Sequence, residues 1–447
     1  MTVVVCVDVG STYTKAAAIE LPSGILLATG SHPTTIRTDI LEGLDAAVAA
    51  VSGGRSVDEI RVCSSAGGGL RLAVIGYERA ITAEAGWRVG LSAGARVVHV
   101  ATGELDSAAA AALIAARPDI VLLCGGTDGG DESVLHNASA LVDCGLNKPV
   151  VVACNAKVAQ RVGQRLIDAG IPATVTANVL PRIGVLDAMP ARIAIREVFI
   201  RHVIGGKELS RGTRFQGLVN CATPDAVLAA VELLVDGGPH EPGMGDVVVV
   251  DVGGATTDVY SAIAPDAEEP ATESVATMWR GRTVEGDLGV RWNAVGILAA
   301  ARSEDLLGAE VEDLLSGAQL RADNPAFLAA TAAERGVDLE LARLAVTVAV
   351  RRHARPYEVP GGTRTKGRDL SRARLVIGSG GVFRHADTAE AAGALEPLAT
   401  DIAGGWRLAD RAEVVIDRGC VLAAAGLLAP DYPDAGMRLL RRSLLSS

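Results

Sequence analysis

The sequence predicts an α/β protein made of two related halves. Short runs of Val, Ile and Leu alternate with helical patterns along the chain, which is typical of α/β folds. A segment rich in Gly and Pro, residues 237–243, interrupts this alternation and divides the chain. On each side of it, the first Val-rich run ends in the same short pattern, Asp-Val-Gly. We therefore expect a duplicated architecture in which the two copies of this pattern face each other.

Length and composition exclude several classes of protein. The 447 residues correspond to two or three domains, and 49% of them are hydrophobic, which is enough for a large core and excludes a disordered chain. The formal charge is −11 and aromatic residues make up only 3%. Nucleic-acid binding depends on basic residues and on aromatic stacking, so the composition argues against it.

Neither a membrane span nor a signal peptide is expected. The most apolar region is interrupted by Arg117-Pro118-Asp119, whereas a span needs about 20 consecutive apolar residues. The N-terminus lacks a basic segment, and Asp8 interrupts its apolar run. The seven cysteines are dispersed, lie mostly in apolar runs and include no Cys-x-x-Cys pair. We therefore expect reduced, buried thiols in a cytoplasmic protein, and not metal ligands.

The first half begins with a strand and continues with alternating elements. Residues 3–7 are almost all Val, as expected for a strand that is buried on both faces. Apolar residues recur every four positions from Val158 to Leu166 and predict a helix that ends before Gly170. Thr223, with the proline that follows it, is typical of a helix start. Strands are predicted at residues 3–7, 15–21, 25–28, 120–124 and 150–153, and helices at residues 106–116, 156–169 and from 223 to the linker.

After the linker the same pattern starts again. We assign residues 1–238 to the first half, with an inserted α/β segment at about residues 125–238. Residues 246–447 form the second half, whose last helix is expected to return towards the first. Arg438, Arg441 and Arg442 near the end are expected to form a solvated face. Strands are predicted at residues 247–250, 259–263, 375–377 and 414–416, and helices at residues 290–301, 339–352 and in the Ala-rich segment near the end.

The repeated pattern is a candidate anion-binding turn. It reads Asp8-Val-Gly10-Ser11-Thr12-Tyr13-Thr14-Lys15 in the first half and Asp251-Val-Gly253-Gly254-Ala255-Thr256-Thr257-Asp258 in the second. Glycines let the backbone turn so that N–H groups converge, and hydroxyls add donors, which suits a phosphate. A carboxylate repels a phosphate unless a cation lies between them, so we expect Asp8 and Asp251 to hold Mg²⁺ through water. Lys15 can neutralise phosphate charge, and two facing turns would clamp a polyphosphate.

A third glycine cluster, Gly378-Ser379-Gly380-Gly381, follows another short predicted strand. Its backbone is expected to approach a flat group such as adenosine. A single Asp-x-Gly hairpin is usually just a tight turn, but three such motifs in this order, each after a buried strand, favour function. The loop at residues 125–130 is a rival phosphate site. It lacks the GxxxxGK[ST] pattern, so a turn or a partner surface is the favoured interpretation.

These motifs resemble those of a known superfamily. DVGSTYTK, DVGGATTDV and IGSGG resemble, in this order, the phosphate-1, phosphate-2 and adenosine motifs of actin, heat-shock chaperones and sugar kinases. The resemblance implies an α/β, actin-like ATPase (ribonuclease H-like) fold, with two pseudo-repeated halves around a nucleotide cleft. A closer resemblance covers nearly the whole chain and is to the MutL/GlmL family, the accessory proteins of adenosylcobalamin-dependent glutamate mutase and related aminomutases. It is carried by residues 63–70, 123–130, 178–181, 284–291 and 367–370.

The resemblance implies an ATP-hydrolysing chaperone that reactivates a cobalamin mutase by releasing its damaged cofactor. ATP and Mg²⁺ would be bound, and the mutase subunits would be partners; homo-oligomerisation stays open. Catalysis and Mg²⁺ binding would belong to Asp8 and Asp251, without a decision on which orients the attacking water. His353, Lys366 and Asp369 are further candidates for nucleotide contact, although a helix-end role is favoured for His353. The implied nucleotide-binding residues are Gly10, Ser11, Thr12, Lys15, Gly253, Gly254, Ala255, Thr256, Gly378, Ser379, Gly380 and Gly381.

Three other functions are compatible with the motifs. A small-molecule kinase of the same superfamily would phosphorylate an acid or a sugar, but the sequence offers no substrate signature. An iron–sulfur activase would need cysteines that bridge a cluster, and their pattern does not suit one. A non-enzymatic filament or scaffold of the actin type would show a nucleotide-dependent size in solution.

Overall fold

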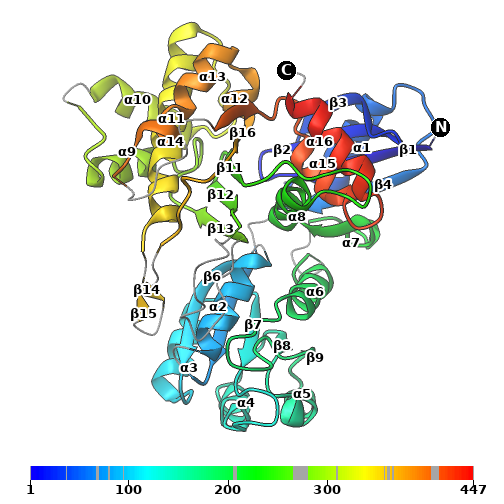
Figure 1. The fold of residues 1–447 in the computed structure, drawn as a ribbon, viewed down its shortest axis with the longest axis vertical. Helices are drawn as coiled ribbons and strands as arrows, with labels where there is room; N and C mark the ends of the chain where they lie inside the picture. Colours follow the sequence, from blue (N-terminus) through cyan, green and yellow to red (C-terminus); the bar gives the residue numbers. More distant parts are fainter. Residues whose placement is uncertain are drawn as a thin grey trace.

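The described part of the chain forms three five-stranded sheets, each with its own covering helices (Figure 1). This computed structural model describes residues 2–445 except residues 37, 67–69, 79–80, 94, 205–208, 265–279, 309–310, 357, 360–362, 365–366 and 404–411. Two of the sheets belong to the predicted halves. The third is inserted in sequence between two strands of the first half, Glu59–Ser64 and Val219–Ala222, and forms a separate body at the bottom of Figure 1.

The sheet of the first half has the order β10-β4-β1-β2-β3. The central strand β1 pairs antiparallel with β2, which pairs antiparallel with β3, while β4 and β10 continue the sheet in parallel on the other side. The Val-rich β1 is buried because helices cover both of its faces, α1 on one side and α8 with α15 on the other. The strands span Thr2–Val9 (β1), Tyr13–Leu21 (β2), Ile25–Pro33 (β3), Glu59–Ser64 (β4) and Val219–Ala222 (β10).

The sheet of the second half repeats this arrangement strand for strand. Its order is β13-β12-β11-β16-β17, with antiparallel pairing of β11, β12 and β13 and parallel pairing of β11, β16 and β17. The predicted duplication is therefore confirmed at the level of topology. The strands span Val247–Val252 (β11), Thr257–Ala262 (β12), Arg280–Glu285 (β13), Leu375–Ser379 (β16) and Glu413–Ile416 (β17).

The inserted sheet is fully parallel and has the order β6-β5-β7-β8-β9. Its first strand begins at Arg71 and its last ends at Val175, whereas we expected the insert at about residues 125–238. The expected start was wrong because β5 and β6 had not been predicted from their sequence. The expected end was wrong because β10 pairs with β4, and so belongs to the first half. The strands span Arg71–Gly76 (β5), Arg96–Thr102 (β6), Ile120–Cys124 (β7), Val150–Val152 (β8) and Ala173–Val175 (β9).

The helices fill the space around these sheets. α16 follows α15, and both contact α8, so the end of the chain packs on the first half as expected. The arginines of α16 do not form a free solvated face: Arg438 and Arg442 donate to carbonyls of residues 22 and 23, and Arg441 donates to the carbonyl of Pro242. The helices are Ile40–Ser52 (α1), Thr82–Ser92 (α2), Ser107–Ala115 (α3), Val134–Asp143 (α4), Ala156–Asp168 (α5), Met189–Val198 (α6), Arg214–Leu218 (α7), Thr223–Asp236 (α8), Ala294–Ser303 (α9), Glu312–Asp323 (α10), Ala332–Ala354 (α11), Gly381–His385 (α12), Thr388–Leu395 (α13), Pro397–Thr400 (α14), Val421–Leu428 (α15) and Pro433–Leu445 (α16).

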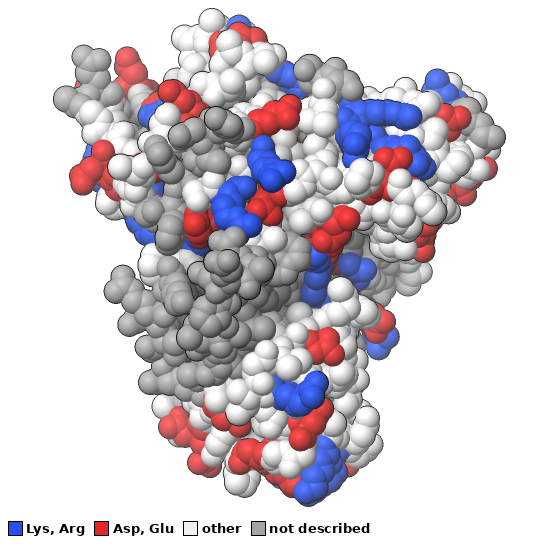
Figure 2. Space-filling model, in the orientation of Figure 1, with Lys and Arg blue, Asp and Glu red and all other residues white. Residues whose placement is uncertain are grey.

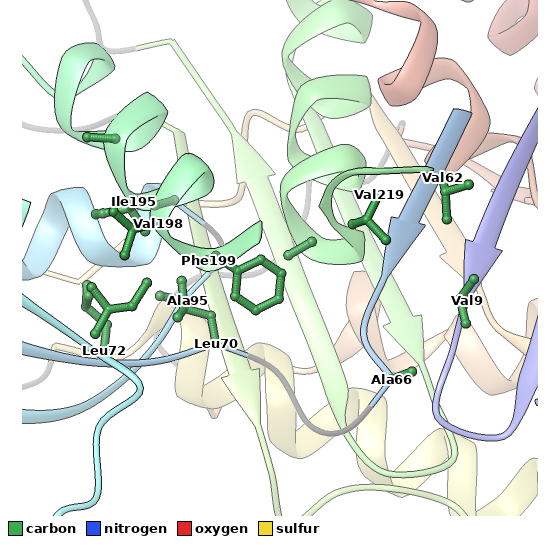
Figure 3. Close-up of a cluster of buried hydrophobic side chains, with 14 of the residues drawn as sticks. Val9, Val62, Ala66, Leu70, Leu72, Ala95, Ile195, Val198, Phe199 and Val219 are labelled. Carbon is green, nitrogen blue, oxygen red and sulfur yellow. The ribbon is translucent and has the colours of Figure 1, made fainter. Parts of the chain in front are cut away.

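The remaining elements are a π-helix at Phe199–Ile204 and a small hairpin of Glu358–Val359 (β14) and Thr363–Arg364 (β15). One hydrophobic core runs continuously from the first half into the insert, with Phe199 between Val219 and Leu70 (Figure 3). This shared core joins the two bodies. No helix in the described part of the chain has the length and hydrophobicity needed to cross a membrane.

Candidate functional site

The two repeated turns have the same backbone geometry. In the first, the N–H of Gly10 donates to the carbonyl of Tyr13 at 3.1 Å, and in the second, the N–H of Gly253 donates to that of Thr256 at 2.9 Å. A Cβ atom at Gly10 would lie 2.8 Å from the Tyr13 oxygen, and one at Gly253 would lie 2.9 Å from the Thr256 oxygen. Both turns therefore require glycine at this position for the same steric reason.

The two turns face each other across the junction of the halves. The Thr12 hydroxyl oxygen lies 3.2 Å from the position that a Cβ atom would take at Gly254. This hydroxyl is buried and has no hydrogen-bond partner, the one hydroxyl in that condition among the described residues. A buried polar group without a partner costs free energy unless something satisfies it. The space at Thr12 and Gly254 thus offers a donor to a ligand oxygen.

Asp8 stands at the carboxyl end of β1 and is held by three neighbours. The Thr223 hydroxyl donates to Oδ1 of Asp8 at 2.6 Å, and the Cys63 thiol lies 3.7 Å from the same oxygen. The Nζ of Lys15 lies 3.8 Å from Oδ2, as the pairing of Asp8 with Lys15 in the sheet requires. These contacts hold the Asp8 side chain in a partly buried position at the end of β1.

Asp251 stands at the equivalent end of β11 and shares the electrostatic environment of Asp8. Burial raises the pKa of Asp251 to about 6, with Asp258 and Asp8 raising it further, while Lys15 and a hydrogen bond with Ser379 oppose the shift. Burial alone would lower the pKa of Lys15, but Cys420, Asp8, Asp251 and Asp417 together raise it above its ordinary value. Two carboxylates and one ammonium group therefore act on one another in a single site.

The third glycine cluster lies beside the second turn. Gly380 has a φ of +119°, and a Cβ atom there would lie 2.2 Å from the carbonyl oxygen of Val252, so this close approach requires glycine. The Ser379 side chain forms a hydrogen bond with Asp251. The short helix α12 begins at Gly381, where a Cβ atom would have no neighbour within 4 Å. Gly378 faces inward, where a Cβ atom would lie 2.6 Å from Leu395.

The other predicted residues of the second turn, Ala255 and Thr256, form hydrogen bonds with neighbouring residues that support the turn. The carbonyl of Ala255 accepts a hydrogen bond from Asn293, and the Thr256 hydroxyl donates to Asp258 at 3.1 Å. Asp258 forms a buried ion pair with Arg282. Asp258 occupies the position that Lys15 has in the first half, so the two turns differ in charge at that point.

A crevice beside Asp8 is bordered by both halves. Lys15 and Thr29 line it from the first half, and Arg384 of α12 and Cys420 line it from the second. The Arg384 guanidinium contacts the Cys420 sulfur at 3.3 Å and the Thr29 hydroxyl at 3.5 Å. Sequence reasoning missed Arg384, Cys420 and Thr223, because each reaches the site from a distant part of the chain.

Two other groups of predicted residues lie outside this site. His353 is fully buried and bonded to Ser261 and Thr283, and burial lowers its pKa well below the ordinary value, so it is a neutral core residue. Asp369 is exposed and accepts only a local hydrogen bond from Ser371, while Lys366 lies outside the described residues. The helix-end interpretation of His353 is therefore the better one.

The loop at residues 125–130 is a braced turn at the carboxyl edge of the inserted sheet. The side chain of Asn155 accepts from Gly129 N–H and donates to the carbonyls of Gly130 and Asp131. Asn178 donates to the carbonyl of Gly126 and to Asp128. These bonds use the polar groups of the loop internally, and the loop belongs to a different sheet from the acidic turns.

The chemistry of the donors fits a phosphate more directly than it fits a metal. The orphan Thr12 hydroxyl, the two glycine turns and the charged Lys15 suit an anionic group with several oxygens. Among the described residues, no cluster of three or more His, Cys, Asp and Glu side chains could hold a metal ion. Asp8 and Asp251 alone suit Mg²⁺, which keeps several waters and takes one or two carboxylates beside phosphate oxygens.

Two equivalent sheets with paired acidic turns define an actin-like ATPase fold. The family model described as "MutL protein" matches residues 4–444. Protein MutL of Clostridium tetanomorphum is 35% identical over 461 aligned positions, which cover 98% of each chain. The chain belongs to the MutL family.

Several solved structures are more distantly similar. A nucleotide-free acetone carboxylase aligns with a TM-score of 0.42 and 14% identity, over 96% of this chain and 70% of its own. A diol dehydratase-reactivating factor aligns with a TM-score of 0.37 and 11% identity, over 97% of this chain and 100% of its own. A glucokinase of the ROK family from Streptomyces griseus aligns with a TM-score of 0.31 and 14% identity, over 94% of this chain and 98% of its own.

Proposed function

We propose that this protein is an ATP-dependent accessory protein that reactivates an adenosylcobalamin-dependent mutase, either glutamate mutase or a related aminomutase. The observation that carries the nucleotide part is the Thr12 hydroxyl, buried and without a partner opposite Gly254, with Asp8 and Asp251 on the flanking strands. The mutase part is supported by membership of the MutL family and by the resemblance described above.

In this proposal the β- and γ-phosphates of ATP bind between the turns. Gly10, Ser11 and Thr12 with Lys15 contact them from the first half, and Gly253 to Thr256 contact them from the second. Ser379, Gly380 and Gly381 border the adenosine, and Gly378 supports them from the core. Mg²⁺, bound through water to Asp8 and Asp251, would screen the phosphate charge.

One of the two aspartates orients the attacking water. Loss of the γ-phosphate removes the ligand that both turns share, so the halves change their relative angle. The mutase subunits bound to the protein are then separated enough to release damaged cobalamin. A small-molecule kinase of the same superfamily is the alternative, and it would transfer the phosphate to an acceptor instead of water.

ATP hydrolysis by the Asp8→Asn and Asp251→Asn variants tests the nucleotide part. We expect phosphate release to fall by roughly 100-fold or more in at least one variant, as is common when a group that positions charge is removed. Asp168→Asn on α5 is the control, because this exposed residue only accepts a bond from Gln164. Parental hydrolysis by both variants would remove the catalytic assignment.

A pull-down with purified mutase subunits, with and without ATP, tests the partner. We expect ATP to change the amount of mutase retained. Phosphate release equal to the ATP consumed, with no acceptor present, would exclude the kinase, whereas hydrolysis that requires an added acid or sugar would support it.

A further inference from the structure

The peptide groups of the two repeated turns are oriented by hydrogen bonds from outside the turns. A trans peptide bond is planar, so its carbonyl and the N–H of the next residue point in opposite directions. A donor that holds the carbonyl therefore also fixes the direction of that N–H group. The carbonyls of Gly10 and Thr12 in the first turn, and the equivalent carbonyls of Gly253 and Ala255 in the second, each accept such a hydrogen bond.

In the first turn, a single residue holds both carbonyls. Thr34 follows β3; its hydroxyl donates to the carbonyl of Gly10 at 2.9 Å, and its N–H donates to the carbonyl of Thr12 at 2.9 Å. The first bond orients the peptide group that carries the Ser11 N–H. The second fixes the backbone of Thr12, whose buried hydroxyl has no partner.

In the second turn, two groups share this role. A backbone N–H of the segment after β13 donates to the carbonyl of Gly253 at 3.1 Å, and Nδ2 of Asn293 donates to the carbonyl of Ala255 at 2.9 Å. The same Nδ2 donates to the carbonyl of Gly286 at 2.8 Å, which holds the side chain in place. The bond to Ala255 orients the peptide group that carries the Thr256 N–H.

The second threonine of the repeated pattern anchors the segments that supply these donors. Thr14 and Thr257 occupy equivalent positions and are both fully buried. The Thr14 hydroxyl forms a 3.1 Å hydrogen bond with the Thr34 hydroxyl, and the Thr257 hydroxyl donates to the carbonyl of Leu288 at 2.7 Å. The repeated pattern therefore contains both the turn and the attachment of the segment that orients it.

The N–H groups that these bonds orient are left free. Within the described part of the chain, nothing accepts a hydrogen bond from the N–H of Ser11 or from that of Thr256. Backbone donors are important here because the chain has a formal charge of −11, and acidic and basic side chains are interspersed on the face shown in Figure 2. Converging N–H groups bind an anion without any charged side chain.

We propose that Thr34 and Asn293 are positioning residues of the candidate nucleotide site. Each holds one carbonyl of its turn and thereby aims the next N–H group, that of Ser11 or of Thr256, at the phosphates of ATP. Neither residue belongs to the repeated pattern. The proposal rests on the nucleotide part of the proposed function.

Titration of Thr34→Val protein with a non-hydrolysable ATP analogue tests the first turn. Valine has the shape of threonine but cannot donate to the Gly10 carbonyl, so we expect the dissociation constant to rise about three- to tenfold. Thr34→Ser keeps the hydroxyl and should bind with an affinity within about twofold of the parent. Thr38→Val is the control, because the exposed Thr38 hydroxyl donates to the side chain of Glu42 and not to the turn.

Asn293→Asp tests the second turn. Asn293 precedes α9, and aspartate is as good as asparagine at a helix start, so the fold should be kept. A carboxylate cannot donate to the Ala255 carbonyl and would repel it, so we expect the dissociation constant to rise at least about tenfold. Asn324→Asp, exposed at the end of α10, is the control and should bind the analogue as the parent does.

AMP binding and thermal melting separate positioning from a general loss of structure. AMP lacks the β- and γ-phosphates, so the Thr34→Val and Asn293→Asp proteins should match the parent in AMP binding and in melting temperature. Three results would overturn the positioning role and leave the proposed function intact: parental affinity for the ATP analogue in either variant, a parallel loss of AMP binding, or failure of Thr34→Ser to restore the affinity. A parent protein that does not bind the analogue would overturn both proposals.

Discussion

The Thr223 hydroxyl donates a 2.6 Å hydrogen bond to Oδ1 of Asp8, across 215 positions of sequence. Thr223 is the first residue of α8, but its side chain does not cap the helix; Ala222 is the N-cap residue. On the opposite turn, the Ser379 side chain forms a hydrogen bond with Asp251. Each aspartate of the pair is therefore oriented by a hydroxyl, but from different places: Ser379 lies opposite Asp251 on the adjacent strand β16, whereas Thr223 follows β10, which is separated from β1 by β4.

Replacement of Thr223 by Val should lower kcat for ATP hydrolysis by roughly 10- to 100-fold, because a hydrogen bond to a charged group is worth about 1.5–3 kcal/mol. KM for ATP should change much less, since Thr223 contacts Asp8 and not the cradle formed by the turns. Steady-state kinetics separate the two parameters. Thr223→Ser keeps the hydroxyl and should restore most of kcat; equal loss in both variants would indicate a packing role instead.

Substitutions at Gly254 and Gly380 should have different effects, the first on ATP binding and the second on stability. Gly254→Val places its side chain against the Thr12 hydroxyl, 3.2 Å from the Cβ position, so we expect at least about tenfold weaker ATP binding with little change in melting temperature. Calorimetric titration with a non-hydrolysable ATP analogue measures the affinity. Parental affinity in this variant would place the phosphates elsewhere.

Gly380→Ala should instead destabilise the fold, by about 2 kcal/mol or more. Its φ of +119° disfavours any side chain, and the new Cβ would lie 2.2 Å from the Val252 carbonyl. Gly336→Ala in α11 is the control, because nothing lies within 4 Å of that position. Denaturant unfolding should leave the control unchanged or slightly more stable, as alanine favours helices.

The raised pKa of Asp251 predicts how stability depends on pH. With a pKa of about 6 in the folded protein and 3.8 in an unperturbed carboxyl, the folded state binds more protons than the unfolded chain between these values. The free energy of unfolding should therefore fall as pH rises from 4 to 6, by roughly 2–3 kcal/mol from this residue. The Asp251→Asn variant should lack this contribution to the pH dependence. Thermal melting without nucleotide at several pH values measures the dependence, and the same pH slope in parent and variant would contradict a raised pKa for Asp251.

The duplicated strands and turns could be predicted from sequence because their signals are local. Val-rich runs indicate buried strands, and the turns at Gly10 and Gly253 depend on contacts only three residues away. The glycine at position 380 was also recognisable, although the contact that explains it, with Val252, is not local. Local sequence patterns were therefore enough to predict the strands and turns that carry the site.

The partners of the two aspartates could not be predicted in the same way. Thr223 had the expected pattern of a helix cap, and the pairing of β10 with β4 is what brings it to Asp8. Arg384 reaches Thr29 from the other half of the molecule. The insert was misplaced for a related reason: whether a strand belongs to one sheet or another is decided by pairing over long distances.

The link between α6 and α8 leads to the final prediction. Arg192→Gln/Arg196→Gln removes both arginines of α6 that pair with α8: Arg196 pairs with Asp225, and Arg192 lies 3.7 Å from Asp225 and 2.9 Å from Glu232. The effect of ATP on the binding of mutase subunits should be lost in this variant, because the contacts that lead from α6 through α8 to Thr223 and Asp8 are broken. Arg192→Lys/Arg196→Lys, which keeps both charges beside a buried aspartate, should retain part of the effect, and Arg165→Gln, exposed on α5, should retain all of it. An unchanged response to ATP in the Arg192→Gln/Arg196→Gln protein, folded as judged by its melting curve, would mean that α6 and the nucleotide cleft communicate by another route.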